Sequence, residues 1–463
     1  MTHPQSVNLV WFRNDLRVKD NSALAAALTE KKPIIAAFFI CEPQWQLHGW
    51  GRLKTQFVMA HAHKLSESLK EKGIGLIVRS VKSFALCGQE LLKICENYNC
   101  VKIFANREYE WDERSRDIQV TQQFKGTTIT THWFDDGLVV APGEILTKSG
   151  DYFKKFTPFK RAWFEKANIH AIKPISQNRS IYDTSAQSEL DILSNSNYSL
   201  EQWPIGEKAA QKILSHFIKN KIKQYDIQRD LPYEEGTSRI SPYLSAGILG
   251  IREIFWQILR HHKIINEGIE VWVSELIWRE FYKHIVFGFP HVCKNRPFDL
   301  TTEAVPWRHA PEEYEAWCKG QTGYPIVDAG MRQLNQEGWM HNRLRMICAS
   351  FLAKHLLIDW RLGEAYFAKQ LIDFDFAANN GGWQWSASTG TDAMPYFRIF
   401  NPILQGKKFD KEAEYIKHYV PELQPLKASD IYKIHLHPKN NYFHPIVQLE
   451  EGRDRCLLAF KQR

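Results

Sequence analysis

The order of apolar and polar positions changes once along the chain. Over the first 135 residues, short apolar runs alternate with amphipathic stretches. The runs are rich in β-branched and aromatic residues, which is typical of buried strands; they cover 7–13, 34–40, 75–81, 101–106 and 128–134. The stretches between them have helical spacing; they cover 21–28, 52–72, 85–98 and 111–124. This alternation predicts an α/β domain with a Rossmann-like parallel sheet.

Two local signals refine the predicted α/β domain. Asn21 lies just before an apolar periodic stretch and is suited to be its N-cap. No GxGxxG motif follows the first strand, so a standard dinucleotide site is not supported there.

The second half of the chain lacks the strand pattern. From about residue 203 to 420, apolar residues recur with helical spacing between Gly and Pro positions. The helices predicted from this spacing are 207–219, 245–261, 268–287, 325–337 and 341–357. Before them, residues 171–200 are polar, with seven serines from Ser176 to Ser199, which is typical of a connection between domains. The predicted division is an α/β domain over 1–135, an interdomain linker over 136–202 and a large all-α domain over 203–463.

Composition adds few constraints. The 463 residues are 44% apolar and 24% charged, as in ordinary soluble proteins, and the net charge of +8 is compatible with a polyanionic partner. The eight cysteines show no metal-binding spacing, so we expect reduced thiols and no metal site. No signal peptide is evident, and no apolar run approaches the ~20 residues that span a bilayer. We therefore expect a cytoplasmic protein that is not bound to a membrane. Ten of the 16 tryptophans follow residue 200.

The segment "GTSRIS" (236–241) is a candidate phosphate site. It offers backbone N–H groups, three hydroxyls and one arginine at a predicted helix start, a combination that suits an anion. An ordinary capped turn has the same composition, so the segment alone does not decide between them.

The segment "ELIWREFY" (275–282) is a candidate ligand-binding face. Glu275 and Arg279 lie four residues apart in a predicted helix, and Trp272 lies three residues before Glu275. Trp278 and Tyr282 lie beside them. An apolar helix with one surface ion pair explains the same pattern.

Two further segments combine amides with large side chains. In "GWMHNRLRM" (338–346), Asn342, Arg343 and Met346 suit a flat, polar-edged heterocycle, whereas His341 is read as structural. In "AANNGGWQW" (377–385), Asn379 and Trp383 share a helical face with Asp375, and Trp385 points elsewhere. The two glycines permit close backbone approach. Core packing is the alternative for each tryptophan taken alone.

Together these strings resemble the photolyase/cryptochrome family, and within it the bacterial class I branch that acts on cyclobutane pyrimidine dimers. The resemblance begins at "LVWFRNDLRVKDN" (9–21), is densest over 225–410, and includes "TGYPIVDAGMRQL" and "SASTGTDAMPYFRIFNP". It implies an N-terminal antenna-binding domain and a C-terminal helical domain that binds FAD, active as FADH⁻, and damaged DNA. The implied activity is light-driven repair of pyrimidine dimers by electron transfer, with the dimer flipped into a pocket over the flavin.

The resemblance also assigns residues. The implied FAD contacts are Tyr225, Thr237, Ser238, Arg239, Ile240, Ser241, Trp272, Glu275, Arg279, Arg345, Asp373, Asp375 and Asn379. The implied DNA contacts are Glu275, Trp278, Asn342, Arg343, Met346 and Trp385. The residues implied in the electron and proton chemistry are Glu275, Asn379, Trp307, Trp360 and Trp383. In this last set, Asn379 matches the position that faces flavin N5, and the three tryptophans match an electron-hopping chain to the surface.

A folate antenna is the least direct implication. Asn106, Glu110, Cys293 and Lys294 match positions that bind 5,10-methenyltetrahydrofolate in related enzymes, although the neighbouring Trp111 departs from the family pattern. The expected partner is UV-damaged DNA, and the expected state is a monomer. Two alternatives remain: a cryptochrome-type blue-light photoreceptor, for which no long C-terminal tail is visible, and an adenylate-transferring enzyme, for which the α/β half offers no phosphate motif.

Overall fold

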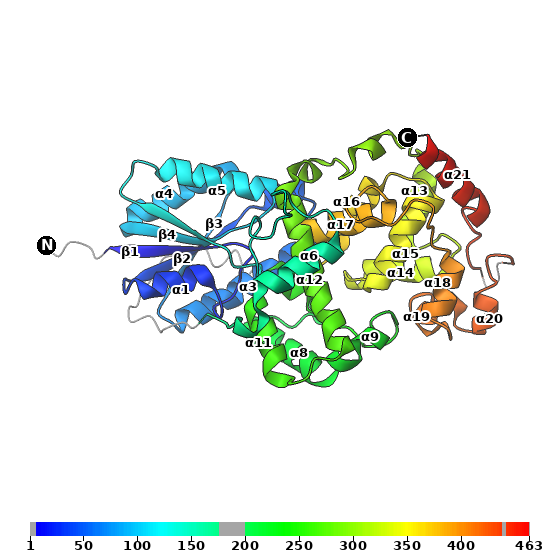
Figure 1. Cartoon of the computed structure of the whole chain (residues 1–463), viewed down its shortest axis with the longest axis horizontal. Coiled ribbons are helices and arrows are strands. Elements are labelled where there is room, and N and C mark those ends of the chain that lie inside the picture. Colours follow the sequence, from blue (N-terminus) through cyan, green and yellow to red (C-terminus); the bar gives the residue numbers. More distant parts are fainter. Residues whose placement is uncertain (1–5, 176–199, 438–440, 463) are drawn as a thin grey trace.

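A computed structural model describes residues 6–175, 200–437 and 441–462. Its N-terminal part contains a five-stranded sheet in the order β3-β2-β1-β4-β5, with all neighbouring strands parallel (Figure 1). The strands are β1 (Val7–Phe12), β2 (Ile34–Ile40), β3 (Gly75–Ser80), β4 (Cys100–Asn106) and β5 (Thr130–Phe134). All five predicted strands are confirmed, with ends that differ by one or two residues.

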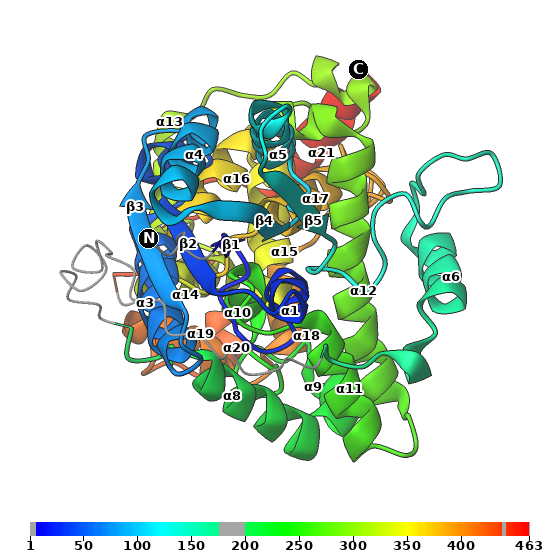
Figure 2. The same ribbon diagram turned by 90° about the vertical axis from the view of Figure 1, so that its left-hand side faces the viewer.

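Helices cover both faces of this sheet. They are α1 (Ser22–Thr29), α2 (Glu42–Leu47), α3 (Arg52–Lys70), α4 (Cys87–Tyr98) and α5 (Trp111–Phe124). In both Figure 1 and Figure 2, α4 and α5 lie on one face and α1 and α3 on the other. The predicted cap is confirmed, because the Asn21 side chain accepts a hydrogen bond from the Leu24 amide. Helix α2 was not predicted from the sequence.

The second half is helical, as predicted. Its α-helices are α8 (Glu207–Asn220), α9 (Tyr225–Gln228), α10 (Ser241–Ser245), α11 (Ile251–His261), α12 (Glu267–Gly288), α13 (Pro311–Lys319), α14 (Pro325–Glu337), α15 (Asn342–Ser350), α16 (Trp360–Gln370), α17 (Phe376–Ala387), α18 (Pro402–Phe409), α19 (Glu414–Tyr419), α20 (Ala428–Ile431) and α21 (Leu449–Lys461). No helix among the described residues combines the length and hydropathy needed to cross a membrane.

Two predicted helices are wrong in extent. The predicted helix 245–261 begins only at Ile251, the start of α11, because residues 246–250 form a turn that passes close to the segment after β1. Gly247 in this turn has a φ of +62°, and a Cβ there would lie 2.1 Å from the carbonyl oxygen of Asn14. The predicted helix 341–357 ends its regular part at Ser350 and continues as a π-helical turn over Phe351–His355.

The predicted linker contains folded structure in its described part. Helix α6 (Phe156–Ala167) buries Phe156, Phe159 and Trp163. Residues 176–199, which include the serine-rich stretch, lie outside the described residues. The three-part division of the chain therefore stays a prediction. Helix α6 packs against α12.

Two large hydrophobic cores hold the molecule together. One extends from the sheet into helices α8, α11 and α12, and it includes Trp11, Phe38, Trp163 and Phe281. The other is formed by helices α13 to α21 and includes Trp383. Helix α12 carries side chains of the first core and also packs against α17, so it connects the two cores.

Candidate functional site

A cavity of about 420 Å³ lies where the carboxyl end of the sheet meets α12, α16 and α17. Asn14 and Glu108, which follow β1 and β4, line one side, and Arg279, Asp375 and Asn379 line the other. The order of strands reverses direction between β1 and β4, where ligands of parallel sheets usually bind. The volume is in the range of cofactor and ligand sites.

Lys283, which the sequence analysis did not identify, contributes a positive charge to this cavity. Nζ of Lys283 lies 2.6 Å from Oε1 of Glu110 and 2.8 Å from Oδ2 of Asp375. Burial by itself raises the pKa of Asp375, but Lys283 and Arg279 lower it to about 2. Arg279 donates to the carbonyl oxygen of Gly137 at 2.8 Å. Helical spacing could have identified Lys283, because it lies four residues after Arg279 on the same helical face.

Asn379 lines the cavity through the first turns of α17. The helix begins at Phe376, and Asp375 is its N-cap, accepting from the Ala378 amide at 3.1 Å. Nδ2 of Asn379 donates to the carbonyl oxygen of Glu364 at 3.1 Å, which fixes the direction of the amide. The Glu364 carboxyl accepts from Asn380 at 2.9 Å, and burial raises its pKa to about 7.

The two glycines of α17 have different surroundings. A Cβ on Gly381 would lie 2.2 Å from two ring carbons of Tyr282, so this glycine lets α17 pack closely on α12. A Cβ on Gly382 would meet nothing within 4 Å. Close packing against Tyr282 therefore explains why residue 381 is a glycine, whereas Gly382 faces open space.

The "GTSRIS" segment meets α15 at a buried carboxylate. Oδ2 of Asp373 accepts from Oγ of Ser241 at 2.6 Å and pairs with Nη2 of Arg345 at 2.8 Å, and its Oδ1 is buried without a partner among the described residues. Arg239 has a φ of +51° and is turned toward Glu337, 3.1 Å away. Helix α10 has only five residues.

The remaining residues of the predicted FAD set differ in burial. Thr237 and Ser238 are half-buried and Ile240 is buried. Tyr225 and Trp272 are buried, and both rings contact Phe217.

The predicted DNA-binding residues form ion pairs that spacing did not predict. Oε1 of Glu275 lies 2.7 Å from Nη1 of Arg229, so Glu275 does not pair with Arg279 as the helical spacing allowed. Nη2 of Arg343 lies 2.7 Å from Oδ1 of Asp230. Both partners lie in the segment after α9, more than 40 positions away in sequence. Chain spacing holds no signal for contacts of this kind.

The other DNA-binding candidates lie nearby on α12, α15 and α17. Nδ2 of Asn342 and Sδ of Met346 are 4.0 Å apart on one face of α15, as predicted. Trp278 and Trp385 are both half-buried and therefore accessible in part. Burial lowers the pKa of His341 to about 4, and its Nδ1 accepts from the Arg343 amide, which fits the structural role predicted for it.

The three tryptophans of the predicted chain belong to one region. Trp383 and Trp360 are buried in the same hydrophobic core, 2% and 1% exposed, and the half-buried Trp307 packs against it. Trp383 makes edge contacts with Phe367 and Trp317. The structure thus gathers residues separated by more than 70 positions, and Trp307 is the most exposed of the three.

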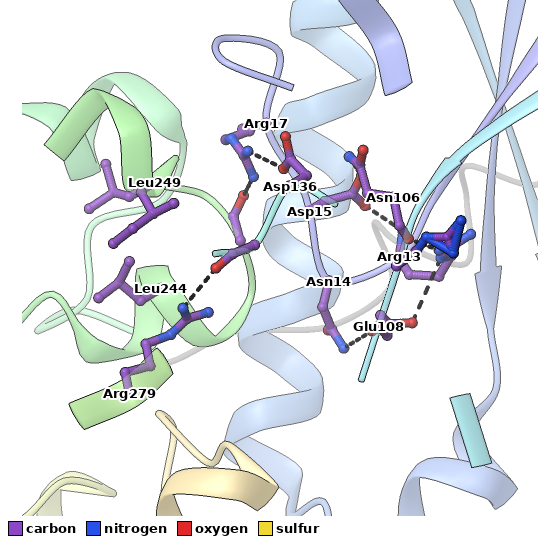
Figure 3. Close-up of a pocket in the computed structure, with 14 residues that line it drawn as sticks. Arg13, Asn14, Asp15, Arg17, Asn106, Glu108, Asp136, Leu244, Leu249 and Arg279 are labelled. Carbon is purple, nitrogen blue, oxygen red and sulfur yellow. Dashed lines mark hydrogen bonds and ion pairs between the residues drawn. The ribbon is translucent and has the colours of Figure 1, made fainter. Parts of the chain in front are cut away.

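The predicted antenna residues divide into two groups. Glu110 and Cys293 line the cavity, and Nζ of Lys294 lies 4.2 Å from the ring centroid of Trp111. Asn106 differs. Its side chain donates to Asp15 at 2.7 Å and to Asn21 at 3.0 Å, and it accepts from the Ala23 amide. This buried carboxamide uses both of its N–H donors within the protein, and it belongs to a polar network at the sheet edge (Figure 3).

Figure 3 shows how this network joins the two halves of the chain. Nδ2 of Asn14 donates to Glu108 at 2.7 Å, and Arg17 is ion-paired with Asp136. Arg17 also donates to the carbonyl oxygen of Gly247 at 3.0 Å, in the turn between α10 and α11. The charged groups in this network pair with one another, so it fixes the sheet edge against the helical part.

His48, which the sequence analysis did not identify, lines the cavity together with Trp111. His48 lies 3.0 Å from Asp112 and 3.2 Å from Glu113. Burial alone lowers its pKa, but the two carboxylates raise it to about 9. No group of three or more possible metal ligands occurs in the described part of the chain.

Comparisons with known proteins identify the family. A model described as "DNA photolyase" matches residues 8–177, and one described as "FAD binding domain of DNA photolyase" matches residues 272–462. The chain is 42% identical to the deoxyribodipyrimidine photo-lyase of Escherichia coli (strain K12), with 98% of each chain covered. It is 40% identical to that of Vibrio cholerae, with 98% of this chain and 99% of that one covered.

Solved structures agree with this match. The bacterial class III photolyase from Agrobacterium tumefaciens has a TM-score of 0.87 at 34% identity, over 100% of this chain and 98% of that one. The Synechocystis sp. PCC6803 cryptochrome has a TM-score of 0.88 at 27% identity, over 99% of this chain and 100% of that one. The α/β and helical halves, the cavity between them and these full-length matches lead to one conclusion: the chain belongs to the DNA photolyase family.

Proposed function

We propose that this protein is a deoxyribodipyrimidine photo-lyase, a flavoprotein that uses light to split cyclobutane pyrimidine dimers in DNA. The observation that carries the proposal is the 42% identity to a deoxyribodipyrimidine photo-lyase over 98% of both chains. The cavity supports it, because amide, cationic and aromatic side chains from both halves of the chain converge there. A blue-light receptor of the cryptochrome type is the less favoured alternative.

Polar groups of the helical half, some of them lining the cavity, fit an FAD molecule. Oδ1 of Asp373, which is buried without a partner among the described residues, can accept from a cofactor hydroxyl. The space beside Gly382 can admit part of the cofactor, and the cations Arg279 and Arg345 can pair with its phosphates. Asn379 would present a neutral amide to the flavin, held in direction by its bond to Glu364. When bound as FADH⁻, the flavin supplies a photoexcited one-electron donor, and the protein positions and tunes it.

The proposed DNA pocket combines aromatic and polar contacts. Trp278 and Trp385 would stack on the two bases of the extruded dimer, and its extrusion costs less than that of a normal pair because the dimer is poorly stacked. Asn342, Arg343 and Met346 would line the pocket from α15. Glu275 would hydrogen-bond the bases, and its partner Arg229 holds it in place at 2.7 Å.

Trp383, Trp360 and Trp307 are proposed as an electron path from the protein surface to oxidised flavin. Their shared core and the greater exposure of Trp307 support Trp307 as the surface end of this path. For the antenna we propose 5,10-methenyltetrahydrofolate beside Glu110, Cys293 and Lys294. The cavity lining adds His48 and Trp111 to this set, whereas Asn106 is not among the residues that line this cavity and bonds to Asp15 and Asn21. A cytoplasmic monomer is the state proposed for the enzyme.

The test uses the reduced, FAD-loaded protein and an oligonucleotide that contains one thymine dimer. Blue light should restore monomeric thymines, and the same mixture kept in darkness should show none. Trp385→Ala, which removes one proposed base-stacking ring, should reduce repair at low DNA concentration. Failure of the FAD-loaded protein to restore thymines under light, with its flavin spectrum intact, would overturn the proposal and favour the receptor.

A further inference from the structure

Trp278 has one face covered by a residue of the segment that joins the two halves of the chain. Phe156, the first residue of α6, stacks on the Trp278 ring with centroids 3.7 Å apart and planes 9° apart. Phe156 is 8% exposed, while Trp278 is half-buried. The ring of Trp278 also meets Phe281 and Tyr282 of its own helix at 5.6 and 5.5 Å. The indole is therefore supported on one face by a ring from outside α12.

Helix α6 is fixed along α12 by further contacts. The Phe159 ring lies 5.2 Å from Phe281, and Nε1 of Trp163 donates to Glu280 at 2.6 Å. Nζ of Lys160 donates to Oγ of Ser274 at 2.7 Å. These contacts extend over more than two turns of α12, so the position of Phe156 is set by the whole of α6.

The same segment is tied to the loop that follows Trp385. The Phe156 amide donates to Oδ2 of Asp392 at 3.1 Å, and Oγ1 of Thr391 donates to the carbonyl oxygen of Lys154 at 2.7 Å. Farther along this loop, the amide of Met394 donates to the carbonyl oxygen of Trp385 at 3.2 Å. The segment around Phe156 thus connects the Trp278 ring to the backbone that carries Trp385.

We propose that Phe156 is a positioning residue for the damaged bases: its ring fixes the plane of Trp278, and its bond to Asp392 fixes that plane relative to Trp385. This inference rests on the proposed function, in which the two tryptophans receive the dimer. An indole stacked on one face at van der Waals distance loses its freedom to rotate, and its exposed part is available to a base. Phe156 itself does not touch the substrate.

The size of the effect follows from the energy of an aromatic pair. The stabilising energy of one aromatic pair corresponds to roughly a two- to tenfold change in a binding constant. Removal of the ring should therefore weaken binding of dimer-containing DNA by about this factor. Binding of undamaged DNA depends mainly on phosphate contacts and should not change. The rate of repair at saturating DNA should stay within about twofold of wild type, since the bound dimer reaches the same flavin.

Phe156→Leu tests this, because it keeps apolar volume but removes the flat ring, and Phe156→Tyr is the matched control that keeps the ring. FAD-loaded proteins are titrated with fluorescent oligonucleotides with and without one thymine dimer, and repair is followed over a range of DNA concentrations. We expect Phe156→Leu to raise KM and the Kd for dimer DNA, and Phe156→Tyr to match wild type. Unchanged dimer binding in Phe156→Leu, or an equal loss for undamaged DNA, would overturn the proposal.

The tether is tested separately at Asp392, whose φ of +46° is compatible with glycine. Asp392→Gly removes the acceptor, and Asp392→Asn retains one. Dimer affinity should fall in the glycine variant and stay near wild type in the asparagine variant; equal affinities would refute the tether. If wild type itself shows no preference for dimer DNA, the proposed function fails along with this inference. A wild-type preference that survives in Phe156→Leu overturns the inference alone.

Discussion

The two adjacent glycines of α17 allow a matched test of close packing. Gly381→Ala would place a Cβ 2.2 Å from the Tyr282 ring, whereas Gly382→Ala would place one in open space. Both positions are inside the helix, so replacing either glycine with alanine should stabilise the folded protein by the same amount, about 0.4–1 kcal/mol, through lower backbone entropy of the unfolded chain. Only Gly381→Ala also forces the ring to move, and it does so by more than 1 Å because carbon contacts lie at about 3.5–4.0 Å.

Overpacking of this kind costs about 1–3 kcal/mol. The Tyr282 ring has little room to yield, since Trp278 and Phe281 flank it at 5.5 and 5.8 Å. We therefore expect Gly382→Ala to be slightly more stable than wild type, and Gly381→Ala to lie about 1–3 kcal/mol below Gly382→Ala. The shared helix term cancels in this difference.

Denaturant unfolding of the two apoproteins, followed by circular dichroism, measures that difference directly. The apoprotein is used so that cofactor binding does not add to the stability. Equal midpoints with equal slopes for both variants would refute the packing argument, because Gly381 would then have the same freedom as Gly382. A larger loss of stability in Gly382→Ala than in Gly381→Ala would also contradict the packing argument.

Three further outcomes are expected. Burial lowers the pKa of Lys54 to about 7 against about 10.4 in the unfolded chain, so wild-type apoprotein should gain stability from pH 7 toward 10. In pH-dependent unfolding, Lys54→Met should lack this gain of up to about 1.4 kcal/mol per pH unit, and a slope equal to wild type would contradict the assignment. Trp360→Phe should block photoreduction of oxidised flavin but spare repair by enzyme reduced beforehand, as measured by flavin absorbance; loss of both would mean a different role. Arg343→Gln should weaken the binding of dimer-containing DNA in fluorescence titrations, because it removes a cation from the proposed pocket, and an unchanged Kd would exclude Arg343 from that pocket.

The sequence determined the elements because strand and helix periodicity are local properties. Alternating apolar runs placed all five strands, and Asn21 was identified as a cap from its position alone. The motifs were sufficient to recognise the family through "GTSRIS" and "AANNGGWQW". Where the sequence prediction failed, as over 245–261, the cause was contact with a distant segment: the turn at Gly247 is shaped by the Asn14 backbone, and helical spacing carries no trace of it.

Tertiary structure alone decided how the site is assembled. Lys283 joins Glu110 to Asp375, Asp230 holds Arg343, and Phe156 covers Trp278, and in each case the partners come from separate elements. Such contacts depend on how α12 lies between the sheet and the later helices, which is a property of the packed cores and not of any short window of sequence. For the same reason, two adjacent glycines that look equivalent in sequence have different roles, one pressed against a ring and the other facing open space.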